Sequence, residues 1–273
     1  MEIPAPIVVF VIGDDHRPEF RDILPTLRAN ALVTNYTTLE QAREANGAPE
    51  LCVFLQSVPG EYAPRDLELL LLSWPLARFL TIAGPLCEGE PRTGAPWPGQ
   101  LRVYWHAFPG WWRLQLARLA AGECAAWQLP RTSREDDVLR GVTSFTPSAL
   151  EGTIGVAAAH SREAARLLVD SLRNAGIDAV PLSAVDNIAV SEILAIVWDD
   201  DAPGAAWRER FSKLCTAWPG TPTVALLNFP RPEDRLFVEA NMASGASGAI
   251  IAKPFDFDAV LATLVAVAGA RTS

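Results

Sequence analysis

The chain has 273 residues, with 23 basic and 32 acidic side chains and a formal net charge of −9. Hydrophobic residues make up 49% of it and charged residues 20%, which excludes a globally disordered chain. The acidic balance argues against a protein that coats nucleic acid, because counterion release requires clustered lysine and arginine. This length is typical of about two domains, each large enough to bury its own core.

Short apolar runs alternate with amphipathic stretches in the first half of the chain. The expected strands are 7–12, 32–37, 51–56, 78–83 and 101–106, and the expected helices are 19–29, 39–46, 64–73 and 111–127. Eight of the 17 residues in 84–100 are glycine or proline, so we expect a long loop there in place of a helix.

The second half repeats the same alternation. Its expected strands are 154–159, 178–182, 194–198, 223–228 and 249–251, and its expected helices are 161–175, 205–217, 232–244 and 257–268. Strands that alternate with helices imply right-handed crossovers and a parallel sheet covered on both faces. The sequence therefore predicts an α/β protein of two doubly wound, three-layer domains in tandem. We place them at 1–128 and 153–273, with a linker at 129–152 that mixes charge, Ser, Thr, Pro and Gly.

Targeting and membrane signals are not expected. Glu2 stands where a signal peptide needs positive charge, and no clean apolar run approaches the roughly 20 residues that span a bilayer. The four cysteines form no CxxC pair, and we expect buried free thiols. We therefore predict a cytoplasmic protein that has no membrane partner.

The second half carries an aspartate at the end of an apolar strand, Asp199, and a Lys-Pro pair after its last expected strand, Lys253-Pro254. In these residues it resembles a receiver domain of bacterial two-component response regulators. Asp199, with Pro203-Gly204 behind it, stands where that family has its phosphoacceptor aspartate and the following Pro-Gly pair. Lys253-Pro254 matches the family's Lys-Pro pair, and Lys253 is one of only two lysines in the chain. The resemblance covers about 120 residues and implies a flavodoxin-like, receiver-like fold, with Lys253 and Leu227 or Asn228 in the positions that contact phosphate.

The resemblance also exposes a departure from the family's chemistry. In the family, two acids after the first strand join the acceptor aspartate in holding Mg²⁺, a hard cation that requires oxygen ligands and neutralises the transferred phosphoryl group. Here these positions fall at Ala159 and His160, and neither supplies a hard oxygen. We therefore expect no metal site in this half, and we predict no metal ligands and no cofactor for the chain as a whole.

The first half departs from the family in the complementary way. Asp14 and Asp15 stand where the acid pair belongs, but the acceptor position falls at Gln56, and an amide is not a useful phosphoryl acceptor. The lysine position falls near His106-Ala107. One half therefore has the acids without the acceptor, and the other has the acceptor without the acids.

Simpler interpretations of these residues stay open. Asp199 and the two aspartates after it are also typical of a solvated acidic loop, and Lys253 is also consistent with a plain salt bridge to Asp199. Asp14 and Asp15 are also placed to cap the first helix. The chain carries no Ser-His-Asp set and no GxSxG, GxxxxGK[ST] or GxGxxG motif.

A second kind of signal is a cluster of aromatic residues between 97 and 112. Trp97, Trp105, Trp111 and Trp112 are candidates for a protein-contact surface, because tryptophan dominates interface hot spots. The same residues are equally compatible with the hydrophobic core.

The preferred hypothesis is a non-enzymatic signal-transduction protein made of two tandem pseudo-receivers of the two-component type. It would act by protein–protein interaction without normal aspartyl phosphorylation, and its partner would be a kinase, another regulator or a second copy in a homodimer. One alternative is a response regulator that is phosphorylated at Asp199. Another is a two-domain α/β enzyme or nucleotide-binding protein with its ligand in the interdomain cleft.

Overall fold

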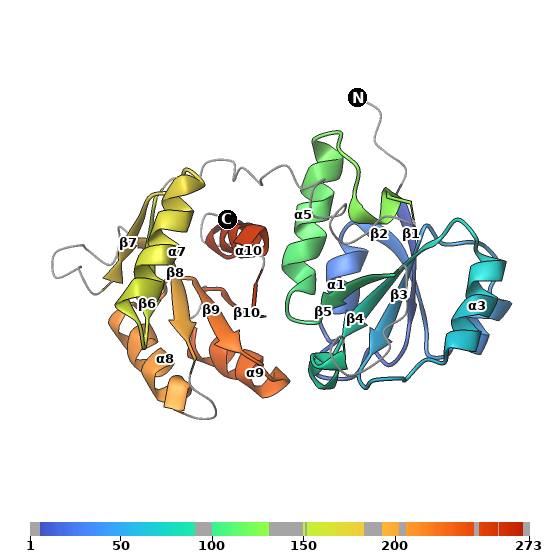
Figure 1. The fold of residues 1–273 in the computed structure, drawn as a ribbon, viewed down its shortest axis with the longest axis horizontal. Helices are drawn as coiled ribbons and strands as arrows, with labels where there is room; N and C mark the ends of the chain where they lie inside the picture. Colours follow the sequence, from blue (N-terminus) through green and yellow to red (C-terminus); the bar gives the residue numbers. More distant parts are fainter. Residues whose placement is uncertain are drawn as a thin grey trace. The chain divides into compact units, whose positions relative to one another are not determined.

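A computed structural model describes residues 6–90, 100–130, 150, 152–182, 193–201, 206–242, 246–255 and 257–269. The chain divides into two compact units, Met1–Thr143 and Ser144–Ser273 (Figure 1). This division falls inside the segment 129–152 that the sequence marks as a linker.

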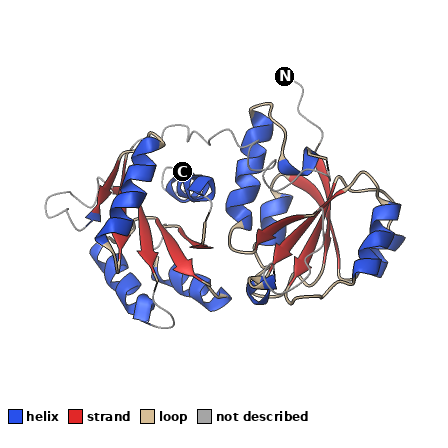
Figure 2. Ribbon diagram, viewed as in Figure 1, coloured by secondary structure: helices blue, strands red, loops and turns tan. Residues whose placement is uncertain are grey.

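A parallel sheet forms the centre of the first unit. Its described strands are β1 (Ile7–Ile12), β2 (Ala31–Tyr36), β3 (Leu51–Gln56), β4 (Arg78–Ala83) and β5 (Leu101–Tyr104), in the order β2-β1-β3-β4-β5. Its helices are α1 (Ile23–Arg28), α2 (Leu39–Glu44), α3 (Pro64–Ser73) and α5 (Phe108–Ala120), with 3₁₀ turns η1 (Pro85–Cys87) and η2 (Ala126–Gln128). Side chains of α1 and α5 pack on one face of the sheet and those of α2 and α3 on the other, so the unit has three layers (Figure 2).

The second unit has the same topology. Its described strands are β6 (Thr153–Ala158), β7 (Ala179–Pro181), β8 (Ile193–Asp200), β9 (Thr223–Asn228) and β10 (Gly248–Lys253), in the order β10-β9-β8-β6-β7. Helices α7 (Arg162–Asn174) and α10 (Phe257–Gly269) cover one face, and α8 (Ala206–Ala217) and α9 (Pro232–Asn241) cover the other. In both units the first strand lies between the second and the third, which is the flavodoxin-like order. The predicted fold class is confirmed.

The ends of two strands and the start of one helix differ from the boundaries expected from the sequence. β8 continues through Asp199 and Asp200, because β6 and β9 pair with it to that depth; the apolar pattern alone ends the strand at Trp198. β5 ends at Tyr104, and α5 begins at Phe108.

The cysteines and the helices bear on two further expectations. The four cysteines are free, but only Cys52 and Cys87 are buried; Cys124 is exposed and Cys215 is partly exposed, so the expectation of uniformly buried thiols is wrong. Across the described ranges, each helix is too short or too polar to cross a membrane.

The two units should fold independently, because each has its own sheet with a core on both faces. Cutting the chain between Thr132 and Ser148 should give two soluble pieces that each unfold cooperatively in urea, as followed by far-UV circular dichroism. Pieces that are insoluble or unfolded would show that the halves share one continuous core.

Candidate functional site

The carboxyl edge of the second sheet brings together the residues that the resemblance singles out. All strand pairs in this sheet are parallel, so their carboxyl ends lie at one edge. The register places Asp199 beside Ala158 of β6 and Leu226 of β9, and Lys253 beside Asn228.

Lys253 forms the centre of the first charge cluster at this edge. Its Nζ contacts Oδ1 of both Asp199 and Asp201, and Asn228 Nδ2 donates to Asp201 Oδ1 at 3.2 Å. Burial alone would lower the pKa of Lys253, but the hydrogen bonds to the two carboxylates outweigh it, and the pKa is raised. The lysine therefore stays charged and holds the end of β8 to the end of β10.

Asp200 forms a second cluster, which we did not predict from the sequence. Its carboxylate is completely buried and accepts hydrogen bonds from Arg210 Nε at 2.8 Å and Arg210 Nη2 at 2.9 Å. His160 Nε2 lies 3.0 Å from the same carboxylate. The hydrogen bond to Asp200 raises the pKa of Arg210. The alternation of side chains along the strand could have predicted the burial of Asp200, since it directs this residue to the face that carries Ile196 and Trp198.

The positions of the family's acid pair hold no carboxylate. Ala159 donates its backbone N–H to the Asp199 carbonyl at 2.9 Å, and the His160 imidazole follows it. Within the described part of the chain, no group of three or more His, Cys, Asp or Glu side chains could hold a metal ion. Asp199 offers one carboxylate, already paired with Lys253, so these residues do not fit the Mg²⁺ site that the resemblance implies.

The acceptor position of the first unit is closed by a buried polar network. Gln56 Nε2 lies 3.3 Å from both Glu90 carboxylate oxygens and donates to the Val58 carbonyl at 3.1 Å. Arg102 Nη1 donates to Gln56 Oε1 at 3.2 Å, and its Nη2 forms an ion pair with Glu90 at 2.5 Å. Both the nitrogen and the oxygen of the Gln56 amide are therefore engaged by neighbouring side chains.

The acids of the first unit stabilise the turn after β1. Asp14 Oδ1 accepts from the backbone N–H of His16 at 3.1 Å, and Asp15 Oδ1 accepts from Asn35 Nδ2 at 2.9 Å. Helix α1 begins only at Ile23, so the expectation that these acids cap it is wrong. Several residues of turn separate them from the helix.

Gly13 shapes the start of this turn. It has a φ of +128°, and a Cβ atom there would lie 2.6 Å from the Tyr62 hydroxyl oxygen. That hydroxyl is in turn within hydrogen-bond distance of the carbonyls of Ile12 and Leu55. The position requires glycine for both conformation and space.

The lysine position of the first unit provides no cation. Burial lowers the pKa of His106 to about 3, so its imidazole is neutral at physiological pH. Its Nε2 lies 4.0 Å from Oε1 of Glu88, and burial raises the pKa of that carboxyl to about 7. The cation that reaches Gln56 is instead Arg102, from within β5.

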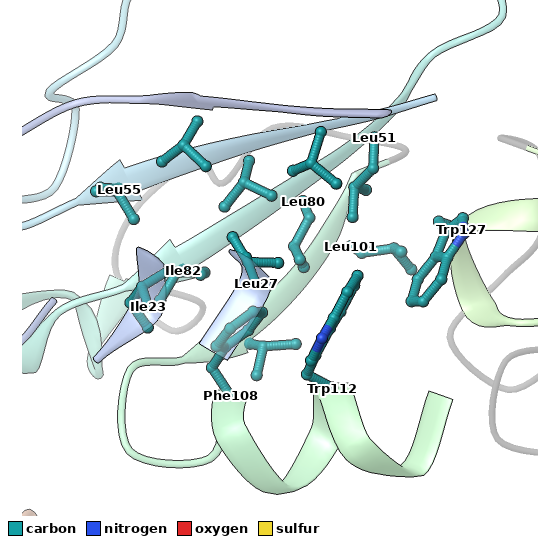
Figure 3. Close-up of a cluster of buried hydrophobic side chains, with 14 of the residues drawn as sticks. Ile23, Leu27, Leu51, Leu55, Leu80, Ile82, Leu101, Phe108, Trp112 and Trp127 are labelled. Carbon is teal, nitrogen blue, oxygen red and sulfur yellow. The ribbon is translucent and has the colours of Figure 1, made fainter. Parts of the chain in front are cut away.

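The aromatic cluster belongs mainly to the core. Trp105 and Trp112 are fully buried, so the interpretation of these two as a contact surface is wrong. Trp112 lies between Phe108 and Trp127 on the inner face of α5, with ring centroids 6.1 and 4.9 Å away (Figure 3). Trp111 is partly buried against the same cluster, and Trp97 lies outside the described residues.

Comparisons with known proteins give only distant similarities. No family model and no curated protein matches the chain. One solved structure, described as a two-component system response regulator/GGDEF domain protein, is 12% identical with a TM-score of 0.36; the match covers 97% of this chain and 100% of that one. Another, residues 700–949 of E. coli RcsC with a linker region and phosphoreceiver domain, is 16% identical with a TM-score of 0.33, covering 96% and 92%.

Proposed function

We propose that this chain is a signal-transduction protein whose two receiver-like units act by binding other proteins, without Mg²⁺-dependent phosphorylation of an aspartate. The proposal rests on the side chains that surround the phosphoacceptor position in each unit. Gln56 is enclosed by Glu90 and Arg102, while Asp199 is paired with Lys253 and has Ala159 and His160 where metal-binding acids would stand.

The chemistry of phosphoryl transfer supports this proposal. The reaction depends on positioning and on neutralising the charge of the transferred group, which a divalent cation supplies in this kind of site. In the second unit, Arg210 and Lys253 already pair with the three successive aspartates. Two cations thus compensate most of the charge of the three carboxylates, and these ion pairs hold the edge together without a metal ion.

Protein binding is supported by an exposed aromatic residue at the same edge. Phe229 follows Asn228 directly, is 70% exposed and has a φ of +46°. A bulky residue in the left-handed region is uncommon, and such strain clusters at functional positions. We expect Phe229 to contact the partner, which would be a kinase, another regulator or a second copy of this chain.

One observation favours phosphorylation of Asp199 as a second candidate function. Its carboxylate lies at the carboxyl end of β8 against Lys253, in the positions that match the phosphoacceptor and the lysine of receivers. In this case the chain would be a response regulator with an altered metal site.

The response to Mg²⁺ distinguishes the two candidates. Millimolar Mg²⁺ should leave the indole ¹⁵N–¹H signal of the buried Trp198 unshifted, because Ala159 and His160 stand where the metal-binding acid pair would be. Trp198→Phe assigns the signal, and Asp199→Ala serves as the control. A saturable shift in the unaltered chain that is lost in Asp199→Ala would contradict the proposal and favour the second candidate.

A further inference from the structure

The link between α2 and β3 carries an Asn-Gly pair, Asn46-Gly47. Of the seven asparagines in the sequence, Asn46 is the one that a glycine follows. Helix α2 ends at Glu44 and β3 begins at Leu51, so the pair lies outside both elements. Both residues are exposed, and they belong to a loop at the amino edge of the first sheet. Water therefore reaches the side chain of Asn46.

The backbone amide of Gly47 is accessible as well. The N–H of Ala45 still closes the last turn of α2, and the N–H of Glu50 already bonds to β1. Among the described residues, no hydrogen bond engages an N–H group between these two. Gly47 has a φ of +115°, and no heavy atom beyond its own chain neighbours lies within 4 Å of the place that a Cβ would occupy. In the described structure, neither a hydrogen-bond partner nor steric crowding therefore shields the Gly47 nitrogen.

An asparagine side chain reacts with the following backbone nitrogen when nothing shields that nitrogen, and asparagine is accordingly among the thermolabile residues. The nitrogen of Gly47 attacks Cγ of Asn46, and the new N–Cγ bond closes a five-membered succinimide. The Cγ–Nδ2 bond breaks, and Nδ2 leaves as ammonia with the proton of the Gly47 amide. Water then opens the ring at either carbonyl and gives aspartate or isoaspartate. The attack is intramolecular, and glycine has no Cβ to hinder it.

We propose that Asn46-Gly47 is a site of spontaneous deamidation in the folded protein, with water as the sole co-reactant. The product carries a new carboxylate between Glu44 and Glu50, in a chain whose formal net charge is already −9. The isoaspartate form also lengthens the link from α2 to β3, because the backbone then runs through the former side chain. The inference is independent of the proposed function, since Asn46 precedes the amino end of β3 and Gln56 lies at its carboxyl end.

Peptide mass spectrometry of the full chain, incubated for days in neutral buffer, tests the site. Position 46 should change steadily from amide to acid, and in H₂¹⁸O each product should carry one oxygen from the solvent. The conversion should be faster in alkaline buffer, because the attacking nitrogen must lose its proton. Asn30 is the matched internal control, since it is also exposed but is followed by Ala31, a residue of β2 that has a Cβ. Asn30 should remain an amide over the same time.

The same incubation in urea measures how far the fold protects the pair. The native chain should convert Asn46 at a rate within a few-fold of the unfolded chain, because the structure leaves the Gly47 nitrogen accessible. Asn46→Gln should abolish the product, since the longer side chain would have to close a larger ring, and Asn30→Gln should leave the rate unchanged. Conversion in urea but not in the native chain would overturn the proposal. Equal conversion at Asn30 and Asn46 in the native chain would overturn it as well.

Discussion

Replacing Trp112 by alanine should lower the free energy of unfolding of the first unit by about 3–5 kcal/mol. The side chain is fully buried between Phe108 and Trp127, so truncation removes apolar contacts and leaves a cavity. Urea denaturation followed by near-UV circular dichroism measures the loss.

Trp111→Ala provides a matched control from the adjacent position. Trp111 is only partly buried at the edge of the same cluster, so its loss should be clearly smaller. If Trp112→Ala stays within about 0.5 kcal/mol of the unaltered chain, the assignment of Trp112 to the core is wrong.

Arg210→Ala should destabilise the second unit by about 3 kcal/mol, because it removes the main partner of a completely buried carboxylate. His160 alone cannot replace two hydrogen bonds from a guanidinium group. Chemical denaturation of the single variants and of the double variant with Asp200→Asn measures the coupling. The double variant should recover much of the loss, since a neutral amide leaves no unpaired charge.

Lys213→Ala is the control for this experiment. Lys213 lies on the same helix and pairs with Glu209 at 2.8 Å, but both side chains are largely exposed. The loss of stability in Lys213→Ala should be much smaller than that in Arg210→Ala, because solvent screens an exposed ion pair. Equal losses for Arg210→Ala and Lys213→Ala would mean that Asp200 is not held as the structure indicates.

The order of strands and helices was predictable because it depends on local patterns. Apolar runs and amphipathic stretches alternate in both halves, and parallel topology follows from that alternation. The end of β8 was not predictable in the same way. Asp199 and Asp200 are polar, yet they extend the strand because the ladders with β6 and β9 continue to that depth.

The contacts within the candidate sites could be predicted from the sequence only for residues that lie at the ends of strands. Asp199 and Lys253 lie at the carboxyl ends of β8 and β10, the two strands that flank β9 in one parallel sheet, so their meeting at the carboxyl edge could be expected from the sequence. The contact between Gln56 and Glu90 spans 34 residues and includes an irregular segment, so no local pattern predicts it. Tryptophan content likewise could not distinguish core from surface, and the burial of Trp105 and Trp112 depends on how α5 packs on the sheet.

Intact-protein mass spectrometry after incubation with acetyl phosphate and Mg²⁺ shows whether this chain undergoes normal aspartyl phosphorylation. A receiver with a complete acid pair serves as the positive control in the same buffer. We expect no phosphoryl increment on this chain, because Ala159 and His160 replace the metal-binding acids and Gln56 replaces the other acceptor. A stable increment that disappears in Asp199→Asn would show that Asp199 is phosphorylated and that the proposed function is wrong.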